Sequence, residues 1–332
     1  MNQIGKLGLA LLAAGAFSCA GAARADCKLI EIAEFRVDPN SARPVVSGAI
    51  NGQPVRILFD TGAATSMIPL AEARRLNLTI SRLNGVRMYG VGGDTAAYDA
   101  NVKELTVDKF TARNLDLVVG GDEYAKLGAS MILGDDFFSQ RDVELDLREG
   151  VVRMFRSERC APPQLVYWGA AYSQATIAAW NRDAPATQTT ILVNGKPVLA
   201  SLDTGSSITV IDAGVVEALG GSRAQGAAGE ELHGIGAKRQ ASWIAHFDSL
   251  EVGDEKLSNV RLQVANVTGA WSQSGTGSQI PYRLESTPSM LLGADFLHAH
   301  RVFIDNQDRL ILFSYEGGPV FRNAEAQASA KP

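Results

Sequence analysis

The chain has 332 residues, and its 31 basic and 36 acidic side chains leave a formal net charge of −5. The basic residues form no cluster, so nucleic acids and anionic membrane surfaces are poor candidates for partners. A chain of this length is expected to form two lobes rather than one.

The first 25 residues have the features of a secretory signal peptide. Lys6 supplies the positive charge, an apolar run follows, and small residues lead to a cleavage site after Ala25. The apolar run is too short to span a bilayer, which argues against a retained membrane anchor. A lipoprotein modified at Cys19 is the weaker alternative, because the residues before it fit a lipoprotein signal poorly. We therefore expect an exported protein, either periplasmic or secreted.

Two cysteines remain after signal removal, Cys27 and Cys160. In an oxidising compartment they are expected to form one disulfide bond that encloses the first half of the chain. Two unpaired thiols are the alternative.

The first lobe is predicted to span residues 26–160. Asn51 and Gly52 separate "VVSGAI" from "VRILF", and an Asn-Gly pair between two β-rich segments is a strong hairpin signal. Asp60 follows the second of these strands as part of "DTG". A short helix is expected to begin at Pro69, and "VELDL" with "VVRMF" predicts a further hairpin.

The second lobe, residues 186–320, is predicted to follow a connector at 161–185. It has the same Asn-Gly hairpin and places Asp203 in a second "DTG". A short helix is expected between Asp212 as N-cap and Gly220 as its end. "VFID" and "RLILF" predict the closing hairpin, and residues 321–332 are expected to form a disordered tail.

The two halves match in order along the chain, which indicates two copies of one unit. "NGQPVRILFDTG" matches "NGKPVLASLDTG", "MYGVGGD" matches "LHGIGAK", and "SMILGDDFF" matches "SMLLGADFL". An insertion at 266–288, rich in Gly, Ser and Thr, is expected to be a surface loop. The fold class is therefore all-β, with a few short helices.

The paired aspartates suggest a chemistry. Two carboxyl groups brought face to face share one proton, because like charges at that distance cannot both ionise. One carboxylate can then accept a proton from water while the other carboxyl donates to a substrate carbonyl, as amide hydrolysis requires.

These motifs resemble the aspartic peptidases of the retroviral-protease and pepsin type. The resemblance covers both "DTG" segments, "ILG" at 132–134 and "LLG" at 291–293, and it extends over nearly all of the chain after the signal peptide. It implies a bilobal aspartic-peptidase fold, with two retropepsin-like β-barrel lobes related by pseudo-twofold symmetry. This chain looks like the single-chain arrangement, in which one molecule carries both aspartates.

The resemblance also implies roles for individual residues. The catalytic pair would be Asp60 and Asp203. The threonines would hydrogen-bond across the lobe junction, and the supporting loops would be Thr61, Gly62, Ala63, Thr204, Gly205 and Ser206. The flaps that cover the substrate would be Tyr89, Gly90, Val91 and Gly92 in the first copy, and His233, Gly234, Ile235 and Gly236 in the second.

The two copies differ at the residue after the "DTG" glycine. Ser206 carries a hydroxyl that could donate to the neighbouring carboxylate and favour its charged form, whereas Ala63 has none. We therefore expect activity at mildly acidic to near-neutral pH, with an optimum that Ala63→Ser would lower.

Other motifs are weaker. His298 and His300 could suggest a metal pair, but packing and turn contacts are the better interpretation without further ligands. The segment from Asp305 looks like a calcium loop but lacks its ligand spacing, so a hairpin turn is expected. "GVGG" lacks the rest of a phosphate-binding motif. No metal and no cofactor are expected.

The sequence thus favours an exported aspartic endopeptidase that acts on extended polypeptide. The alternative is a catalytically inactive peptide-binding protein that uses the same inter-lobe cleft. The two copies are expected to pair with each other, giving a monomer, because the connector keeps them at high effective concentration. Pairing with copies in a second chain is the alternative.

Overall fold

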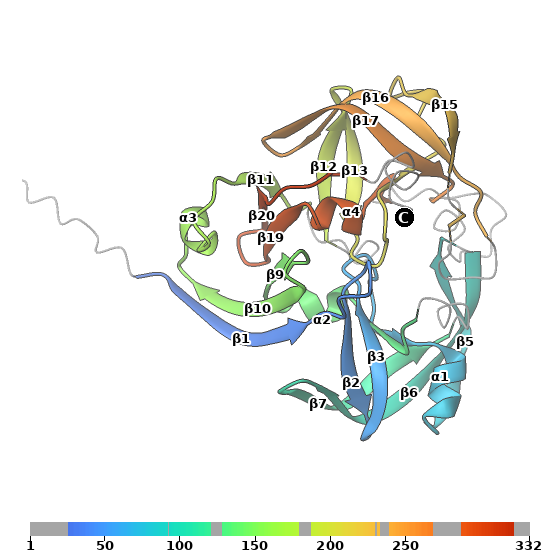
Figure 1. The fold of residues 1–332 in the computed structure, drawn as a ribbon. Coiled ribbons are helices and arrows are strands. Elements are labelled where there is room, and N and C mark those ends of the chain that lie inside the picture. Colours follow the sequence, from blue (N-terminus) through green and yellow to red (C-terminus); the bar gives the residue numbers. More distant parts are fainter. Residues whose placement is uncertain are drawn as a thin grey trace, which may run out of the picture.

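The fold consists of two lobes of β-strands and a third sheet where they meet (Figure 1). A computed structural model of the chain describes residues 26–91, 93–120, 128–178, 187–229, 231–232, 239–267 and 287–321, and the side chains of Tyr89 and of residues 225–228 are not described. Within these ranges no helix is both long enough and apolar enough to cross a membrane.

The first lobe is a seven-stranded sheet in the order β2-β3-β8-β4-β7-β6-β5. An additional pairing between β2 and β6 closes six of these strands into a barrel, and β5 continues the sheet beyond it. The elements are β2 (Val45–Ile50), β3 (Gln53–Phe59), β4 (Met67–Ile68), α1 (Leu70–Arg75), β5 (Ile80–Gly90), β6 (Gly93–Val107), β7 (Phe110–Val119), β8 (Met131–Leu133) and α2 (Asp135–Phe138).

The second lobe repeats this topology, with the order β12-β13-β18-β14-β17-β16-β15 and closure between β12 and β16. The identical strand order confirms the predicted bilobal, all-β fold with two related barrels. The elements are β12 (Gln188–Val193), β13 (Lys196–Leu202), β14 (Val210–Asp212), β15 (Ser222–Ala228), β16 (Trp243–Val252), β17 (Glu255–Ala265), β18 (Met290–Leu292) and α4 (Ala294–Leu297).

The Asn-Gly pairs form the turns that the sequence predicts. Asn51 and Gly52 have φ values of 49° and 77°, and Asn194 and Gly195 have values of 50° and 73°. Positive φ at both turn residues matches the twist of the flanking strands, which explains the choice of Asn and Gly. Each turn fixes the register of a hairpin whose second strand, β3 or β13, leads directly into a "DTG" loop.

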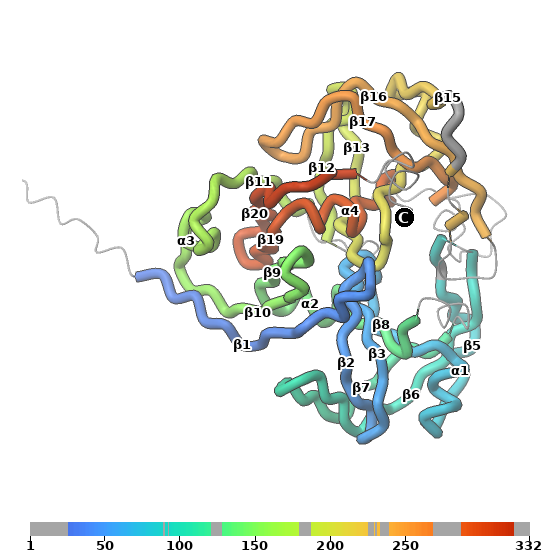
Figure 2. The backbone as a smooth tube through the Cα atoms, in the orientation of Figure 1, coloured from blue at the N-terminus to red at the C-terminus, as the bar shows by residue number. Residues whose placement is uncertain are grey.

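The third sheet has six strands drawn from both halves of the chain, in the order β1-β10-β9-β19-β20-β11 (Figure 2). At its centre β9 pairs with β19, so that Val143 lies opposite Ile304. The elements are β1 (Lys28–Arg36), β9 (Asp142–Asp146), β10 (Val151–Glu158), α3 (Pro162–Leu165), β11 (Ser173–Thr176), β19 (His300–Asp305) and β20 (Leu310–Tyr315). The segment predicted as a connector thus contributes α3 and the edge strand β11.

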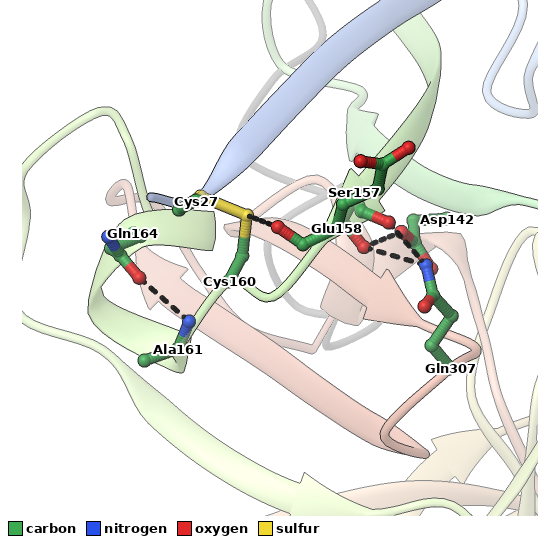
Figure 3. The surroundings of a disulfide bond; sticks show 8 residues. All are labelled: Cys27, Asp142, Ser157, Glu158, Cys160, Ala161, Gln164 and Gln307. Carbon is green, nitrogen blue, oxygen red and sulfur yellow. Dashed lines mark hydrogen bonds between the residues drawn. A yellow bond between two sulfur atoms is a disulfide. The ribbon is translucent and has the colours of Figure 1, made fainter. Parts of the chain in front are cut away.

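A disulfide bond joins Cys27 and Cys160, whose Cα atoms are 4.5 Å apart (Figure 3). It links the start of β1 to the residues just after β10, the strand with which β1 pairs. Close by, the Ser157 hydroxyl donates to the Asp142 carboxylate, and the Gln307 side-chain amide donates to the Ser157 carbonyl at 2.6 Å. These contacts attach the first half of the chain to the β19–β20 turn of the second.

The helix predictions were correct in one lobe and wrong in the other. In the first lobe α1 follows Pro69, which is its N-cap residue rather than its first helical residue. In the second lobe residues 213–220 form consecutive turns, and Asp212 ends strand β14. The Asp212 carboxylate accepts from the Gly214 N–H at 2.9 Å and also from the Val267 N–H at 3.0 Å. Gly214 and the β-branched residues that follow it have low helix propensity, so the hydrogen bonds of the Asp212 carboxylate prevail.

Candidate active site

Asp60 and Asp203 lie at equivalent positions, one residue beyond β3 and β13. Each main-chain N–H donates at 2.9 Å to a carbonyl of a neighbouring short strand, Leu133 in β8 or Leu292 in β18. These strands run parallel to β3 and β13 and carry the apolar-apolar-Gly segments noted in the sequence. Each "DTG" loop is therefore held against such a segment.

The two loops bring their carboxyl groups together at the lobe junction. Asp60 is 8% exposed and Asp203 is 9% exposed, and each carboxyl group lies against the loop glycine of the other lobe. A Cβ atom at Gly62 would lie only 2.5 Å from the Cγ of Asp203, and one at Gly205 would collide with the Asp60 carboxyl. Glycine is thus required after each threonine because the loop of one lobe passes against the carboxyl group of the other.

Thr61 and Thr204 join the lobes behind the carboxyl groups. The Thr61 N–H donates to the Thr204 hydroxyl at 3.0 Å, and the Thr204 N–H donates to the Thr61 hydroxyl at 3.2 Å. Each hydroxyl in turn donates at 2.6 Å to a main-chain carbonyl of the opposite lobe, Leu202 for Thr61 and Phe59 for Thr204. The threonines are fully buried, and all their polar groups in this arrangement have partners.

The proton of the pair is expected on Asp203. Burial raises the pKa of both carboxyl groups. For Asp60, the N–H groups of Gly62 and Ala63, the hydrogen bond from Asp203 and the charge of Arg43 act in the opposite direction. For Asp203, the negative charge of Asp60 raises the pKa further, and the N–H groups of Ser206 and Gly205 lower it, so that its pKa lies well above the ordinary range. The two carboxyl groups are therefore expected to share one proton, with Asp60 favoured as the charged member.

The expected role of the Ser206 hydroxyl is wrong. This hydroxyl donates to the carbonyl of Ile208 at 2.7 Å, within its own loop, and not to a carboxylate. The Asp203 carboxyl is contacted instead by the Ser206 main-chain N–H at 3.0 Å, and the Ala63 N–H makes the equivalent 3.0 Å bond to Asp60. Since a main-chain N–H is available whatever the side chain, the serine–alanine difference does not distinguish the two aspartates.

Arg43 is a charged neighbour that the sequence did not indicate. Its Nη1 donates to the carbonyl of Gly205 at 3.4 Å, so the guanidinium of the first lobe reaches the "DTG" loop of the second. Burial lowers the pKa of Arg43, whereas the charges of Asp60 and Asp203 raise it. The available signal was an Arg-Pro pair just before the first strand, with no basic residue at the equivalent place in the second copy.

The first flap segment is the tip of the β5–β6 hairpin. Gly90 pairs with Gly93, Tyr89 pairs with Asp94, and Val91 lies in the turn. An ion pair between Arg87 and Asp94 spans the hairpin near its tip. The side chain of Tyr89 lies outside the described part of the structure, as does Gly92.

The second flap segment lies outside the described residues. This applies to all four of its predicted residues, His233, Gly234, Ile235 and Gly236. A single bridge between Leu232 and Gln240 brackets the segment.

The histidines and the acidic turn make protein contacts. The His298 Nε2 lies 3.0 Å from the Ala42 carbonyl, and His300 lies between the Phe296 carbonyl at 2.8 Å and the Glu255 carboxylate at 3.0 Å. The Asp305 carboxylate accepts N–H groups within the β19–β20 turn. In the part of the chain that is described, no three His, Cys, Asp or Glu side chains are grouped as a metal site would require.

Both halves match known families. The family described as "gag-polyprotein putative aspartyl protease" matches residues 46–140, and the family described as "Aspartyl protease" matches residues 189–296. Each match contains one "DTG" loop, and the two together take in more than half of the chain. The chain belongs to the retropepsin-like aspartic peptidases, with one family unit in each half.

Individual proteins with similarity to this chain have low sequence identity to it. Pol polyproteins of equine infectious anemia virus, strain Wyoming and isolate 1369, are each 27% identical over 116 residues, which is 33% of this chain. The aligned part spans 10% of those polyproteins. The solved aspartic proteinase from Irpex lacteus aligns with 88% of this chain and 98% of its own, with a TM-score of 0.45 and 11% sequence identity.

Proposed function

We propose that the protein is an exported aspartic endopeptidase in which Asp60 and Asp203 activate a water molecule for peptide-bond hydrolysis. The observation that carries this proposal is the pair of buried carboxyl groups presented at the lobe junction by two equivalent loops, each carboxyl group against the loop glycine of the other lobe. Burying two carboxyl groups against each other costs free energy. A protein that only binds peptides would gain nothing from that cost.

The proposed reaction begins with Asp60 ionised and Asp203 protonated. Asp60 removes a proton from water as the water oxygen bonds to the substrate carbonyl carbon, and Asp203 donates its proton to the carbonyl oxygen. The resulting diol collapses when Asp60 returns its proton to the amide nitrogen and Asp203 takes a proton from a diol hydroxyl. The C–N bond breaks, and both aspartates regain their starting states.

The substrate is proposed to be an extended polypeptide bound between the lobes. In support, the β5–β6 hairpin projects from the first lobe on the side of the molecule away from the central sheet (Figure 1). A hairpin of this kind can pair its main chain with that of an extended peptide, which favours polypeptides over compact ligands. The proposed enzyme needs no metal or cofactor, since the carboxyl pair supplies both acid and base.

Cleavage of an intrinsically unstructured protein tests the proposal. Wild type is expected to cleave it, pepstatin to inhibit the cleavage, and Asp60→Asn and Asp203→Asn each to abolish it while circular dichroism shows a retained fold. Cleavage that persists in both variants would remove the two-aspartate mechanism. Absent cleavage in folded wild type, together with peptide binding that both variants retain, would favour the peptide-binding alternative.

Export and assembly are separate parts of the proposal. The disulfide supports an oxidising compartment, so the mature protein is expected outside the cytoplasm with Asp26 at its N-terminus. N-terminal sequencing after cell fractionation tests this.

The pairing of both loops within one chain supports a monomer, and activity per molecule that falls on dilution would contradict it.

A further inference from the structure

Helix α2, whose first residue is Asp135, lies where the lobes meet (Figure 1). The Asp135 main-chain N–H donates at 2.7 Å to the carbonyl of Ala63, the residue that follows the loop glycine. In the second lobe Ala294 makes the equivalent main-chain bond to Ser206 at 2.8 Å. The main-chain contact is therefore common to both lobes, whereas a carboxyl group at this position occurs in the first lobe alone.

The Asp135 carboxyl points across the junction to the other lobe. It is 4% exposed, and its Oδ1 accepts a hydrogen bond from the Thr187 hydroxyl at 3.1 Å. The carbonyl of Thr187 accepts the N–H of Leu202 at 2.9 Å, and Leu202 directly precedes Asp203. A continuous path of three hydrogen bonds thus runs from the loop of Asp60, through Asp135 and Thr187, to the strand that carries Asp203.

The adjacent carboxylate, Asp136, has a different task that both lobes share. It accepts from the Ser66 N–H at 2.9 Å and from the Ser66 hydroxyl at 2.7 Å, within the first lobe. In the second lobe the Thr209 hydroxyl donates to Asp295 at 2.7 Å in the same way. Each loop therefore has equivalent support without the Asp135 carboxyl group, which adds a contact between the lobes.

We propose that Asp135 and Thr187 are positioning residues that set the placement of the two catalytic loops relative to each other, in addition to the threonine pair. The inference rests on the proposed function, because its consequence is the alignment of Asp60 and Asp203 around one water molecule. Small displacements of reacting groups cost large factors in rate, so loss of this link affects turnover more than substrate binding.

Two single variants and their double variant test the inference. Thr187→Val removes the donor without changing the shape of the side chain, and Asp135→Ala copies the residue that the second lobe carries at this position. Each is expected to lower kcat about tenfold or more with KM nearly unchanged, and the double variant is expected to lose no more than one single variant. Thr187→Ser, which keeps the hydroxyl, is expected to restore kcat.

The matched control is Thr189→Val, two residues further along β12. Thr189 is also buried, and its hydroxyl donates to the Thr176 carbonyl at 2.9 Å, away from both "DTG" loops. It is expected to lose stability like Thr187→Val but to keep wild-type kcat.

The outcomes separate the two proposals. Wild-type kcat in both single variants would overturn the positioning role and leave the proposed peptidase intact. Unfolding of both single variants, while Thr189→Val folds, would show that the contact is only structural. A folded wild type without hydrolysis would overturn the proposed function and this inference together.

Discussion

The hydroxyl of Thr204 in the second lobe donates to the carbonyl of Phe59 in the first, at 2.6 Å, and accepts the N–H of Thr61 at 3.0 Å. Thr61 makes the reciprocal contacts, so each "DTG" loop is hydrogen-bonded to the opposite lobe rather than only to its own. The relative position of the two carboxyl groups therefore depends on how the lobes are joined.

Thr204→Val is expected to lower the free energy of unfolding by about 1–3 kcal/mol, because it leaves the Phe59 carbonyl and the Thr61 N–H buried without a partner. Proteolytic activity should fall further than stability alone explains, since the loops lose their mutual alignment. Urea unfolding and initial cleavage rates measure the two effects. Unchanged activity in a destabilised variant would restrict these threonines to a structural role.

Arg43→Met is expected to move the acidic limb of the pH–rate profile to higher pH. The positive charge of Arg43 lowers the pKa of Asp60, so its removal lets the carboxyl pair hold its second proton at higher pH. Arg56→Met is the control, because Arg56 pairs with Asp38 and donates to the carbonyl of Gly128. Arg43→Lys should restore most of the wild-type profile. An acidic limb that does not move in Arg43→Met would contradict the electrostatic role.

Asp135 is expected to make stability depend on pH between about 4 and 7. Burial raises the pKa of Asp135 from an ordinary value of 3.8 to about 7, the Thr187 hydrogen bond lowers it, and the neighbouring Asp136 raises it. A folded-state pKa above the unfolded value means that the folded state binds the proton more tightly. The stabilisation that comes from this tighter proton binding by Asp135 is fully present below pH 3.8 and is lost as the pH rises through about 7.

Asp135→Asn tests this dependence because it keeps the size of the side chain and cannot ionise. The stability difference between the variant and wild type should change in favour of the variant as the pH rises through this window. Chemical denaturation at several pH values measures the difference. A constant difference across the window would show that Asp135 does not titrate there.

Ser206→Ala and Ala63→Ser are both expected to leave the position of the pH–rate profile unchanged. The Ser206 hydroxyl donates to the Ile208 carbonyl, so its removal costs about 1 kcal/mol of stability and alters neither carboxyl group directly. This replaces the expectation from sequence that Ala63→Ser lowers the optimum. A shift of the optimum in either variant would show that the hydroxyl reaches the carboxylate during catalysis.

The sequence predicted those parts of the fold and site that depend on local chemistry or on repetition. The Asn-Gly turns require positive φ at both residues, so Asn51 and Asn194 indicated hairpins directly. The internal repeat then implied two similar lobes, and the observed strand order has that symmetry. The approach of the two "DTG" loops followed from the family resemblance, because no local pattern specifies a contact between residues so far apart.

The features that the sequence did not predict depend on tertiary contacts. Arg43 reaches Gly205 only because the lobes pack with the first strand of one beside the loop of the other. The bond between Asp135 and Thr187 likewise joins residues with no shared motif. The Ser206 hydroxyl donates to the nearby carbonyl of Ile208, and the residue type alone does not specify which acceptor it takes. The turns at 213–220 replaced a helix because side-chain contacts of Asp212 outweighed a weak propensity.

The pairing of β9 with β19 has an evolutionary consequence. Val143 and Leu145 of one half lie opposite Ile304 and Val302 of the other, so equivalent strands meet along an axis of approximate symmetry. A free-standing first half would present the edge of β9 to solvent, and a second copy of itself is the partner whose strand fits that edge. The chain is therefore organised as a duplicated and fused homodimer. Because one chain carries both halves, they need not be identical, and Arg43 and Asp135 are differences that a dimer of identical subunits could not contain on one side alone.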